Sequence, residues 1–310
     1  MKLVFCGTPQ FAVPSLERLV ATGHDVQLVV TQPDRPQGRG MEVTAPPVKQ
    51  SALRLGLPIR QPEKIKKNDE FRASLTAIQP GAIIVVGYGR IIPDWMLQLP
   101  PYGNINVHAS LLPKYRGAAP IQWAIANGET VTGVTTMRID EGLDTGDILL
   151  KEEMIIAPED TAVTLSPRLA ELGAELLVET LERLEQGTIK PVPQDDSLAT
   201  LAPILKKEDG LVDFTGTAKE IHNRLRGFQP WPGAYTHFRG KNLKILAAQV
   251  AHASRQITPA ELQVTGDTLL AGCGSGTALR LLHIQPEGKK AMSARDFISG
   301  YRPQQGERLG

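Results

Sequence analysis

The first part of the chain alternates short apolar runs with segments whose apolar residues recur at helical spacing. The apolar runs predict strands at 2–6, 25–31, 58–61 and 82–86, the third being the weakest. The helical spacing predicts helices at 11–20, 48–55 and 70–78. This alternation is typical of a doubly wound, mostly parallel α/β sheet, which binds ligands at the carboxyl ends of its strands.

The same kind of pattern continues to residue 187. Further strands are expected around Asn106, at 131–139 and at 148–156, and further helices at 94–99, 121–126 and 162–185. Pro167 interrupts the pattern of the last helix. Either this helix is kinked near its start, or it begins with Ser166 as its cap and Pro167 in the first helical position.

After residue 206 the pattern changes to short β segments separated by glycine, with one helix at 218–226. Five strands are predicted, at 231–238, 243–251, 262–264, 268–273 and 278–285, which suits a small OB-like β-barrel. The stretch before this part has three prolines and little periodicity. We therefore expect a first domain at 1–187, a linker at 188–205 and a second domain at 206–310.

The composition is that of a globular protein. The chain has 310 residues, of which 41% are hydrophobic, enough for two domains with sizeable cores. No apolar run approaches the roughly 20 residues of a membrane span, and the chain does not begin with a secretory signal pattern. We expect a cytoplasmic protein without membrane contact. Cys6 and Cys273 lack metal or disulfide spacing, so we expect two core thiols.

The net charge of +1 conceals an asymmetry between the two parts of the chain. Residues 1–205 carry 19 Lys and Arg against 24 Asp and Glu, whereas residues 206–310 carry 15 against 9. The balance therefore moves from −5 to +6, which favours a polyanionic partner for the second part. A basic face that is merely solvated remains the alternative.

The stretch from 103 to 147 holds the best candidate for chemistry. Asn106 and His108 are two residues apart in a predicted strand, so their side chains point to one face. Asp144 follows in a glycine-rich loop, where Asp147 is interpreted as turn chemistry. Asn106 and a protonated His108 could stabilise an oxyanion while an amine attacks a carbonyl, and Asp144 could hold the imidazole and receive the proton. Such a site requires no metal. A structural histidine is the commoner alternative for a lone Asn-x-His.

Two loops are candidate binding segments. The loop after the second strand carries Arg35 and Arg39 among prolines and glycines, which suits a mobile clamp on phosphate; a solvated turn is the alternative. Residues 87–93 follow the fourth strand and are placed to line a pocket beside Asn106. The first strand is not followed by G-x-G-x-x-G, so a dinucleotide is not indicated.

The order of several motifs resembles that of the formyltransferases that use 10-formyltetrahydrofolate, over nearly the whole chain. The motifs are Gly7-Thr8-Pro9, Thr31-Gln32-Pro33-Asp34-Arg35-Pro36, Asn106-x-His108, Ser110-Leu111-Leu112-Pro113, Gly142-Leu143-Asp144-Thr145-Gly146, Gln229-Pro230-Trp231-Pro232 and Gly288-Lys289-Lys290-Ala291-Met292-Ser293-Ala294.

The resemblance implies a fold, a reaction and a set of site residues. The fold would be a Rossmann-like catalytic domain followed by an OB-like basic domain, acting as a monomer. The reaction would move the formyl group of 10-formyltetrahydrofolate, a co-substrate, to the amino group of methionyl-initiator tRNA. The implied catalytic residues are Asn106, His108 and Asp144; the implied folate-site residues are Ser110, Leu111, Leu112, Pro113, Tyr88 and Ile91; the implied tRNA contacts are Arg35, Arg39, Lys49, Lys206 and Lys207.

The sequence departs from the family pattern in the Arg-bearing loop, and two other functions remain alternatives. Met41 and Glu42 stand where many relatives have further basic residues, so the loop's electrostatic share should be smaller. A related enzyme acting on a small amine, such as an amino sugar nucleotide, would share the catalytic motifs. A non-catalytic RNA-binding protein is the third possibility, which intact Asn106, His108 and Asp144 argue against.

Overall fold

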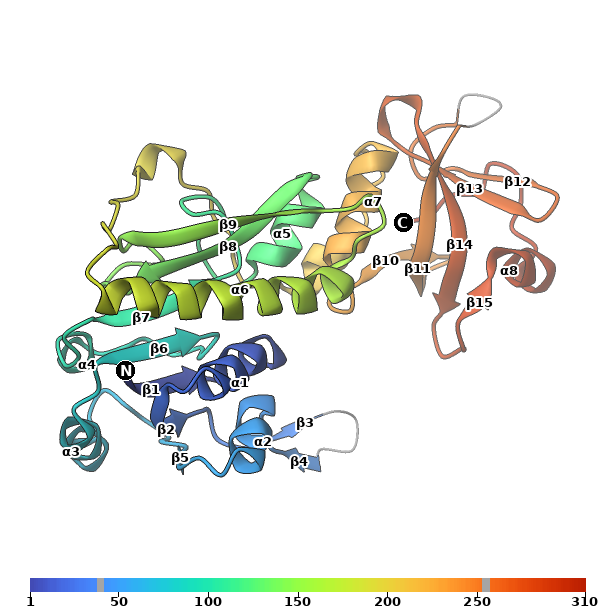
Figure 1. Ribbon diagram of the computed structural model, residues 1–310. Helices are drawn as coiled ribbons and strands as arrows, with labels where there is room; N and C mark the ends of the chain where they lie inside the picture. Colours follow the sequence, from blue (N-terminus) through green and yellow to red (C-terminus); the bar gives the residue numbers. More distant parts are fainter. Residues whose placement is uncertain (38–41, 253–256) are drawn as a thin grey trace. The chain divides into compact units, whose positions relative to one another are not determined.

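The computed structural model describes residues 1–37, 42–252 and 257–310 (Figure 1). Arg39 lies outside these described residues. The chain forms two compact units. Unit 1 contains residues 1–120, 131–155 and 166–202, and unit 2 contains 121–130, 156–165 and 203–310. Residues 188–202, which lie in the predicted linker, thus belong to unit 1.

Unit 1 is built on a seven-stranded sheet, as the apolar runs predict. Its strands are β1 (Lys2–Gly7), β2 (Asp25–Val30), β5 (Ile59–Arg60), β6 (Ala82–Val86), β7 (Asn104–His108), β8 (Val131–Arg138) and β9 (Ile148–Ile155), in the order β5-β2-β1-β6-β7-β8-β9. The first five in this order are parallel, β8 is antiparallel to β7, and β9 is antiparallel to β8. All five side chains of β6 are buried, as in a strand covered on both faces. The mostly parallel α/β prediction is confirmed.

The order of the strands places a topological switch point between β1 and β6. From β1 the chain moves outward through β2 to β5, then returns to β6 on the other side of β1 and continues to β7. Loops that leave β1 and β6 in opposite directions open a ligand-binding crevice between them. Gly7 marks the close approach there, because a Cβ at this position would lie 3.1 Å from the carbonyl oxygen of Val86.

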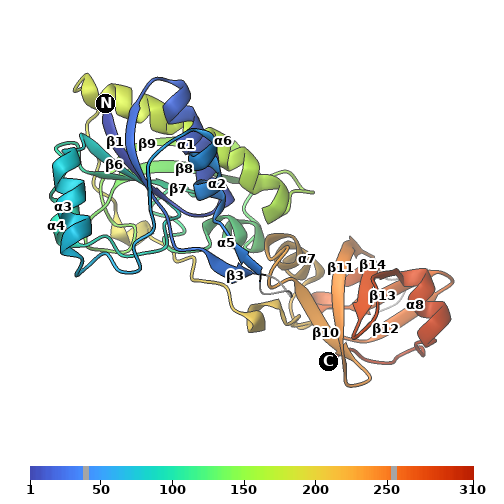
Figure 2. The same ribbon diagram turned by 90° about the horizontal axis from the view of Figure 1, so that it is seen from below.

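Helices cover both faces of this sheet. On one face, α3 (Asp69–Ile78) and α4 (Asp94–Leu97) contribute to a buried cluster with side chains of β1, β2 and β6. The other face carries α1 (Val13–Ala21) and α6 (Ala162–Glu185), which are joined by an ion pair of 3.1 Å between Arg18 and Glu175 (Figures 1 and 2). Next to α1 lies α2 (Pro47–Arg54), whose Ser51 donates to Glu17 over 2.7 Å.

Helix α6 begins at Ala162, four residues before Ser166. The start of this helix is capped by Thr161 and Thr164, because the backbone N–H of each donates to the other's hydroxyl oxygen. Pro167 lies inside the helix. The interpretation in which Ser166 caps the helix is therefore wrong.

The Arg-bearing loop contains a short hairpin that the sequence pattern does not predict. Strand β3 (Arg35–Gln37) pairs with β4 (Glu42–Thr44) in antiparallel register, and Arg35 lies opposite Thr44. Three-residue strands are too short for an alternating pattern to reveal them. The predicted helix at 121–126 is present as α5 (Pro120–Ala126).

Unit 2 is an antiparallel sheet domain with the five predicted strands. They are β10 (Ala234–Phe238), β11 (Lys241–Ala251), β12 (Leu262–Thr265), β13 (Thr268–Gly272) and β14 (Ala278–Pro286), ordered β10-β11-β14-β13-β12. The predicted helix is α7 (Ala218–Gly227), begun by a capping box of Thr217 and Glu220. The expectation of a single helix is wrong. A second, α8 (Ala294–Tyr301), follows the two-residue strand β15 (Met292–Ser293) and is capped by Ser293.

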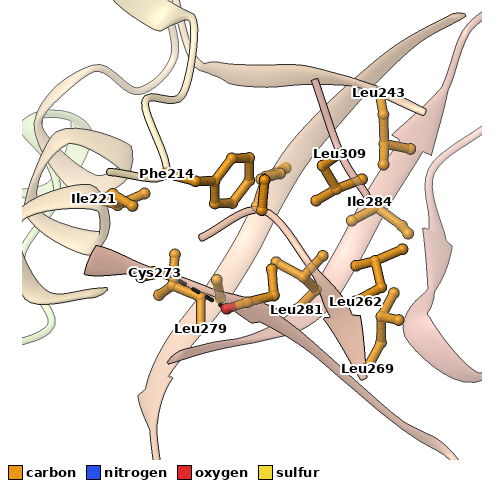
Figure 3. Packing of buried hydrophobic residues seen from close by; sticks show 14 of the residues in the cluster. Phe214, Ile221, Leu243, Leu262, Leu269, Cys273, Leu279, Leu281, Ile284 and Leu309 are labelled. Carbon is orange, nitrogen blue, oxygen red and sulfur yellow. Dashed lines mark hydrogen bonds between the residues drawn. The ribbon is translucent and has the colours of Figure 1, made fainter. Parts of the chain in front are cut away.

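The core of unit 2 lies between these strands and the two helices. Figure 3 shows Phe214 and Ile221 packed with leucines of β11 to β14 in one buried cluster. Cys273 is fully buried here, and its burial raises the pKa of its thiol to about 12. Cys6 is equally buried in unit 1, where burial raises its pKa further. Both cysteines are core thiols, as expected.

Candidate active site

The carboxyl end of β7 positions two of the predicted catalytic side chains. Asn104, Asn106 and His108 alternate along this strand and share one face. Asn104 is used structurally, since its amide donates to the carbonyl oxygens of Met96 and Leu97. His108 is 6% exposed, whereas Asn106 is half-buried.

The loop at 140–147 brings Asp144 back to this strand end. The carboxylate of Asp140 shapes the loop by accepting hydrogen bonds from the backbone of Gly142 and the hydroxyl of Thr145. Asp144 itself adopts a φ of +53°, in the left-handed region. Gly146 is required by the close packing, because a Cβ there would lie 2.0 Å from the carbonyl oxygen of Arg138.

The carboxylate of Asp144 lies close to both of the other predicted catalytic side chains. Its Oδ2 lies 3.7 Å from Nδ1 of His108 and accepts a hydrogen bond of 2.9 Å from the backbone N–H of Gly117. Its Oδ1 accepts from the amide of Asn106 over 3.5 Å. The structure therefore brings together all three residues that the motif order predicts as catalytic.

The imidazole of His108 has a defined orientation. Its Nε2 lies 2.9 Å from the carbonyl oxygen of Tyr115. Because a carbonyl oxygen can only accept, Nε2 carries a hydrogen, and Nδ1 is the nitrogen that faces Asp144. The sequence predicts that Asp144 holds the imidazole, and the 3.7 Å between Oδ2 and Nδ1 is longer than a hydrogen bond. The carbonyl of Tyr115 fixes the ring, and the Nδ1 edge is left for chemistry.

The predicted folate segment 110–113 has both structural and accessible side chains. Ser110 is fully buried and its hydroxyl donates to the carbonyl oxygen of Lys114, which closes the turn. Leu112 is also fully buried, in a small cluster with Met137 and Ile148. Leu111 and Pro113 are partly exposed. Within this segment, the side chains available to a ligand are those of Leu111 and Pro113.

Of the other two predicted folate-site residues, Tyr88 is buried and Ile91 is exposed. Tyr88 is 1% exposed and packs in the core with Phe71 and Met96, where burial raises the pKa of its hydroxyl. This hydroxyl has no hydrogen-bond partner among the described residues. Ile91 is 91% exposed. An apolar side chain so exposed in the loop after β6 is suited to contact with an aromatic ligand.

The residues predicted to contact tRNA fall into two groups. Arg35, Lys206 and Lys207 are exposed. Lys49 instead forms an ion pair with Asp34, with 2.6 Å between Nζ and Oδ2. The hydrogen bonds from Lys49 and Gln61 lower the pKa of the Asp34 carboxyl. Because Asp34 and Lys49 flank the hairpin, this pair joins the two ends of the Arg-bearing loop.

Two side chains that support the site were not singled out by sequence reasoning. Arg116 is 6% exposed, and its guanidinium donates to Gln194. Gln194 in turn donates to the backbone carbonyls of Asp144 and Gly146. Arg116 lies within the stretch from 103 to 147, but Gln194 offers no signal, since its partners are backbone atoms 48 and 50 residues away.

A metal site and a membrane span both lack support in the part of the chain that the structure describes. It contains no group of three or more His, Cys, Asp or Glu side chains that could hold a metal. No helix in it is long and apolar enough to cross a membrane. A cavity of about 630 Å³ lies in unit 2 between α7 and the start of β10. Its lining includes Asp209, Asp213 and Glu220, whose carboxylates all accept hydrogen bonds from neighbouring residues.

Comparison with protein families identifies the class. Residues 1–181 match the formyl transferase family model, and residues 204–302 match the model of the formyl transferase C-terminal domain. A solved N-formyltransferase of Helicobacter canadensis, in complex with folinic acid and dTDP-3-aminofucose, has a TM-score of 0.66 over 92% of this chain and 99% of its own, at 20% identity. The fold is thus that of the folate-dependent formyltransferases which the motif order resembles.

Relatives that are similar over the full chain identify the particular family of formyltransferases. The methionyl-tRNA formyltransferase of Koribacter versatilis is 69% identical over 310 residues, which are 100% of this chain and 99% of the relative. That of Acidobacterium capsulatum is 63% identical over the whole of both chains. The chain belongs to the methionyl-tRNA formyltransferase family.

Substitution of Gly117 by alanine should disturb the site through its backbone. Gly117 has a φ of +122°, and a Cβ would lie 2.6 Å from the carbonyl oxygen of Ala202. We expect Gly117→Ala to cost about 2–4 kcal/mol of unfolding free energy, since both the strain and the clash oppose it. Formyl transfer should fall more than stability alone requires, because the N–H to Asp144 moves. Denaturant unfolding and a formylation assay measure the two effects.

Gly103 provides the matched control. It has a φ of +84°, but no atom lies within 4 Å of its Cβ position. Gly103→Ala should therefore show only the backbone strain. Equal losses of stability and activity in the two variants would contradict the special role of Gly117.

Proposed function

We propose that this chain transfers the formyl group of 10-formyltetrahydrofolate to the free amino group of methionyl-initiator tRNA, for the initiation of translation. The observation that carries the proposal is the convergence of Asn106 and His108 on the carboxylate of Asp144. It occurs in a chain that is 69% identical, over its full length, to a methionyl-tRNA formyltransferase. We further propose that it acts as a monomer in the cytoplasm.

The reaction forms one C–N bond and breaks another. The amine nitrogen attacks the formyl carbon, the carbonyl oxygen gains negative charge, and the bond from the formyl carbon to the folate nitrogen then breaks. The amine loses one proton and the folate nitrogen gains one. The α-amine of an amino acid has an ordinary pKa of about 8, so a useful fraction is neutral near pH 7. The protein therefore needs to orient the reactants, stabilise the oxyanion and move one proton.

Asn106 and His108 are placed to stabilise the oxyanion. Asn106 is half-buried at the strand end and can donate an Nδ2–H to the developing charge. His108, once protonated, can donate from Nδ1, because its Nε2 hydrogen is held by the carbonyl of Tyr115. Donors fixed in advance cost little reorganisation when the charge appears, and removing one such donor typically lowers kcat about 10²–10³-fold.

Asp144 is placed to receive the proton from the amine. Its side chain is 18% exposed, so an amine can approach it from the crevice. Its separation of 3.7 Å from Nδ1 of His108 is longer than a hydrogen bond. Such contacts commonly shorten when the substrate complex forms. We propose that Asp144 takes the amine proton and that protonated His108 gives its Nδ1 proton to the folate nitrogen. Asp144 then passes its proton to Nδ1 of His108.

The co-substrate fits the residues that surround this strand end. Ile91, Leu111 and Pro113 offer partly or fully exposed apolar surface beside the crevice. Tyr88 is 1% exposed, so its side chain packs in the core and does not itself contact a bound molecule. Apolar walls with a few polar groups are the usual lining of a site for a small aromatic molecule. We propose that Ile91, Leu111, Pro113 and the backbone of segment 110–113 hold the folate.

The tRNA would contact basic side chains of the Arg-bearing loop and of the second domain. We propose that Arg35 and Arg39 of the loop, Lys206 and Lys207, and the second domain at 206–310 with its net charge of +6 bind the phosphate backbone. The ion pair with Asp34 suggests that Lys49 supports the loop as well as adding charge.

Salt dependence tests this electrostatic contact. Substitution of both Lys206 and Lys207 by alanine should weaken tRNA binding and lower the slope of log Kd against log salt by about 1–2, since each phosphate contact releases about one counterion. Filter binding across a range of salt concentrations measures the slope. The matched control is a second pair of consecutive, exposed lysines, Lys66 and Lys67. An unchanged slope in the Lys206, Lys207 variant would remove these residues from the interface.

The identity of the acceptor is settled by one assay. The protein is given 10-formyltetrahydrofolate with charged initiator tRNA, charged elongator tRNA and an amino sugar nucleotide in parallel reactions. We expect kcat/KM to be highest for methionyl-initiator tRNA. Transfer to the sugar nucleotide at an equal or higher rate would replace the proposed acceptor, and the absence of folate-dependent transfer to all three would leave an RNA-binding function.

A further inference from the structure

The segment 192–202, here called the return segment, packs against both loops that form the candidate site. Its first residue, Val192, exchanges backbone hydrogen bonds of 2.9 Å with Ile148, at the start of β9. Its other end pairs with the turn after β7, where the N–H of Arg116 donates to Thr200 and the N–H of Ala202 donates to Arg116. The return segment therefore spans the turn at 113–117 and the strand that follows the Asp144 loop.

Between these two ends, Gln194 and Arg116 join the loops directly. The Nε2 of Gln194 donates to the carbonyl oxygens of Asp144 over 2.9 Å and Gly146 over 2.8 Å. Its Oε1 accepts from Nε and Nη2 of Arg116, over 3.1 and 2.9 Å. One carboxamide thus uses its donor end on the Asp144 loop and its acceptor end on the turn after β7.

Arg116 lies between two residues whose backbone groups contact His108 and Asp144. The carbonyl of the residue before it, Tyr115, holds Nε2 of His108. The N–H of the residue after it, Gly117, donates to the carboxylate of Asp144. A change in the position of Arg116 would therefore move the groups that fix both partners.

We propose that Arg116 and Gln194 are positioning residues that set the separation between His108 and Asp144. The inference rests on the proposed function, because it assigns these residues to the geometry of that same reaction. Neither side chain needs to touch a substrate. The Arg116 guanidinium is buried apart from its outer contact with Asp196, which is 80% exposed on its side chain. A buried guanidinium that donates twice to a neutral carboxamide costs desolvation free energy. That cost is explained if the pair defines a geometry.

Substitution of Gln194 by glutamate separates positioning from general stability. A carboxylate at this position still accepts from Arg116 and adds charge attraction, so the fold keeps a partner for the buried guanidinium. It has no hydrogen to donate to the carbonyls of Asp144 and Gly146 and repels them. A displacement of about 1 Å near reacting groups can cost about 10²-fold in rate. We expect kcat to fall about 10–100-fold, with KM for the folate within about threefold and a similar unfolding midpoint.

Two further variants test the pair. Arg116→Lys keeps one donor to Gln194 and should retain more activity than Arg116→Ala. Combining Arg116→Lys with Gln194→Glu should cost less than the sum of the two single effects, because both act on one contact. Gln186→Glu is the matched control for the charge change, since Gln186 is exposed at the end of α6. It should keep wild-type activity.

A spectroscopic measurement reports on the site without turnover. In protein labelled with ¹⁵N in its histidines, the His108 Nε2–H bonded to Tyr115 should give a protected imidazole signal. Gln194→Glu should shift the Nδ1 resonance of His108, which faces Asp144, and Gln186→Glu should not. An unshifted resonance, or kcat within twofold of wild type in a folded Gln194→Glu variant, overturns the proposal. A Gln194→Glu variant that unfolds at the assay temperature also overturns it in favour of a purely structural role. Failure of the wild-type protein to transfer formyl groups would contradict the proposed function alone, because the resonance shift is still measurable.

Discussion

Substitution of His108 by alanine should lower kcat for formyl transfer by about 10²–10⁴-fold, the range associated with the loss of an acid–base group or an oxyanion donor. His108 is 6% exposed, and its ring is fixed by the carbonyl of Tyr115 with Nδ1 toward Asp144. Alanine removes the Nδ1 edge and leaves a small cavity. Single-turnover formylation with preformed methionyl-initiator tRNA measures the chemical step, and the Kd for that tRNA should change by less than about threefold.

His24 is a suitable control for this experiment. His24 is another histidine of unit 1. It is partly buried, and this burial lowers its pKa. It precedes β2, so it lies at the amino edge of the parallel strands, opposite the carboxyl end of β7 where His108 lies. His24→Ala should retain formyl transfer. Normal turnover by His108→Ala would exclude His108 from the reaction.

The sequence predicts the part of the site that depends on local periodicity. A strand has a side-chain period of two, so Asn106 and His108 had to share a face, and they do. Short apolar runs separated by helical segments also give the parallel sheet, and with it the edge at which ligands bind. These features depend on residues near one another in the chain.

The rest of the site depends on contacts between distant residues. Asp144 reaches Asn106 and His108 because its loop adopts a positive φ and is held by Gln194, 50 residues away. Nothing in the spacing of these residues encodes that approach. Motif order did bring Asp144 into the predicted site, since the resemblance carries information about the fold that periodicity lacks.

Burial decides which side chains of a recognised motif are accessible, and the motif itself does not show it. Ser110 and Leu112 lie within the motif, yet their side chains close a turn and fill a core. Tyr88 is likewise placed in the core by its aromatic ring. Lys49 reads as one more positive charge in a basic loop until its partner Asp34 is seen. In each case, the competing requirement is a hydrogen bond or apolar contact that forms only in the folded chain.

Substitution of Asp144 by asparagine should abolish most formyl transfer without disturbing the fold. The side chains have nearly the same shape, and the Oδ of asparagine can still accept from the N–H of Gly117. The negative charge facing Nδ1 of His108 is lost, and an amide cannot take the proton of the attacking amine. We expect kcat to fall about 10³-fold or more, as for other carboxylates paired with a catalytic histidine.

Asp147 gives the matched control, since it is the other partly exposed carboxylate at the end of the same loop. Its backbone carbonyl, not its carboxylate, accepts a hydrogen bond from the N–H of Arg138. Asp147→Asn should therefore keep its activity within about threefold, the range of a surface substitution. If both variants lost activity equally, the loop would contribute only its overall charge. If Asp144→Asn alone lost it, with tRNA affinity and unfolding midpoint unchanged, the carboxylate would be the proton acceptor that the convergence of three contacts indicates.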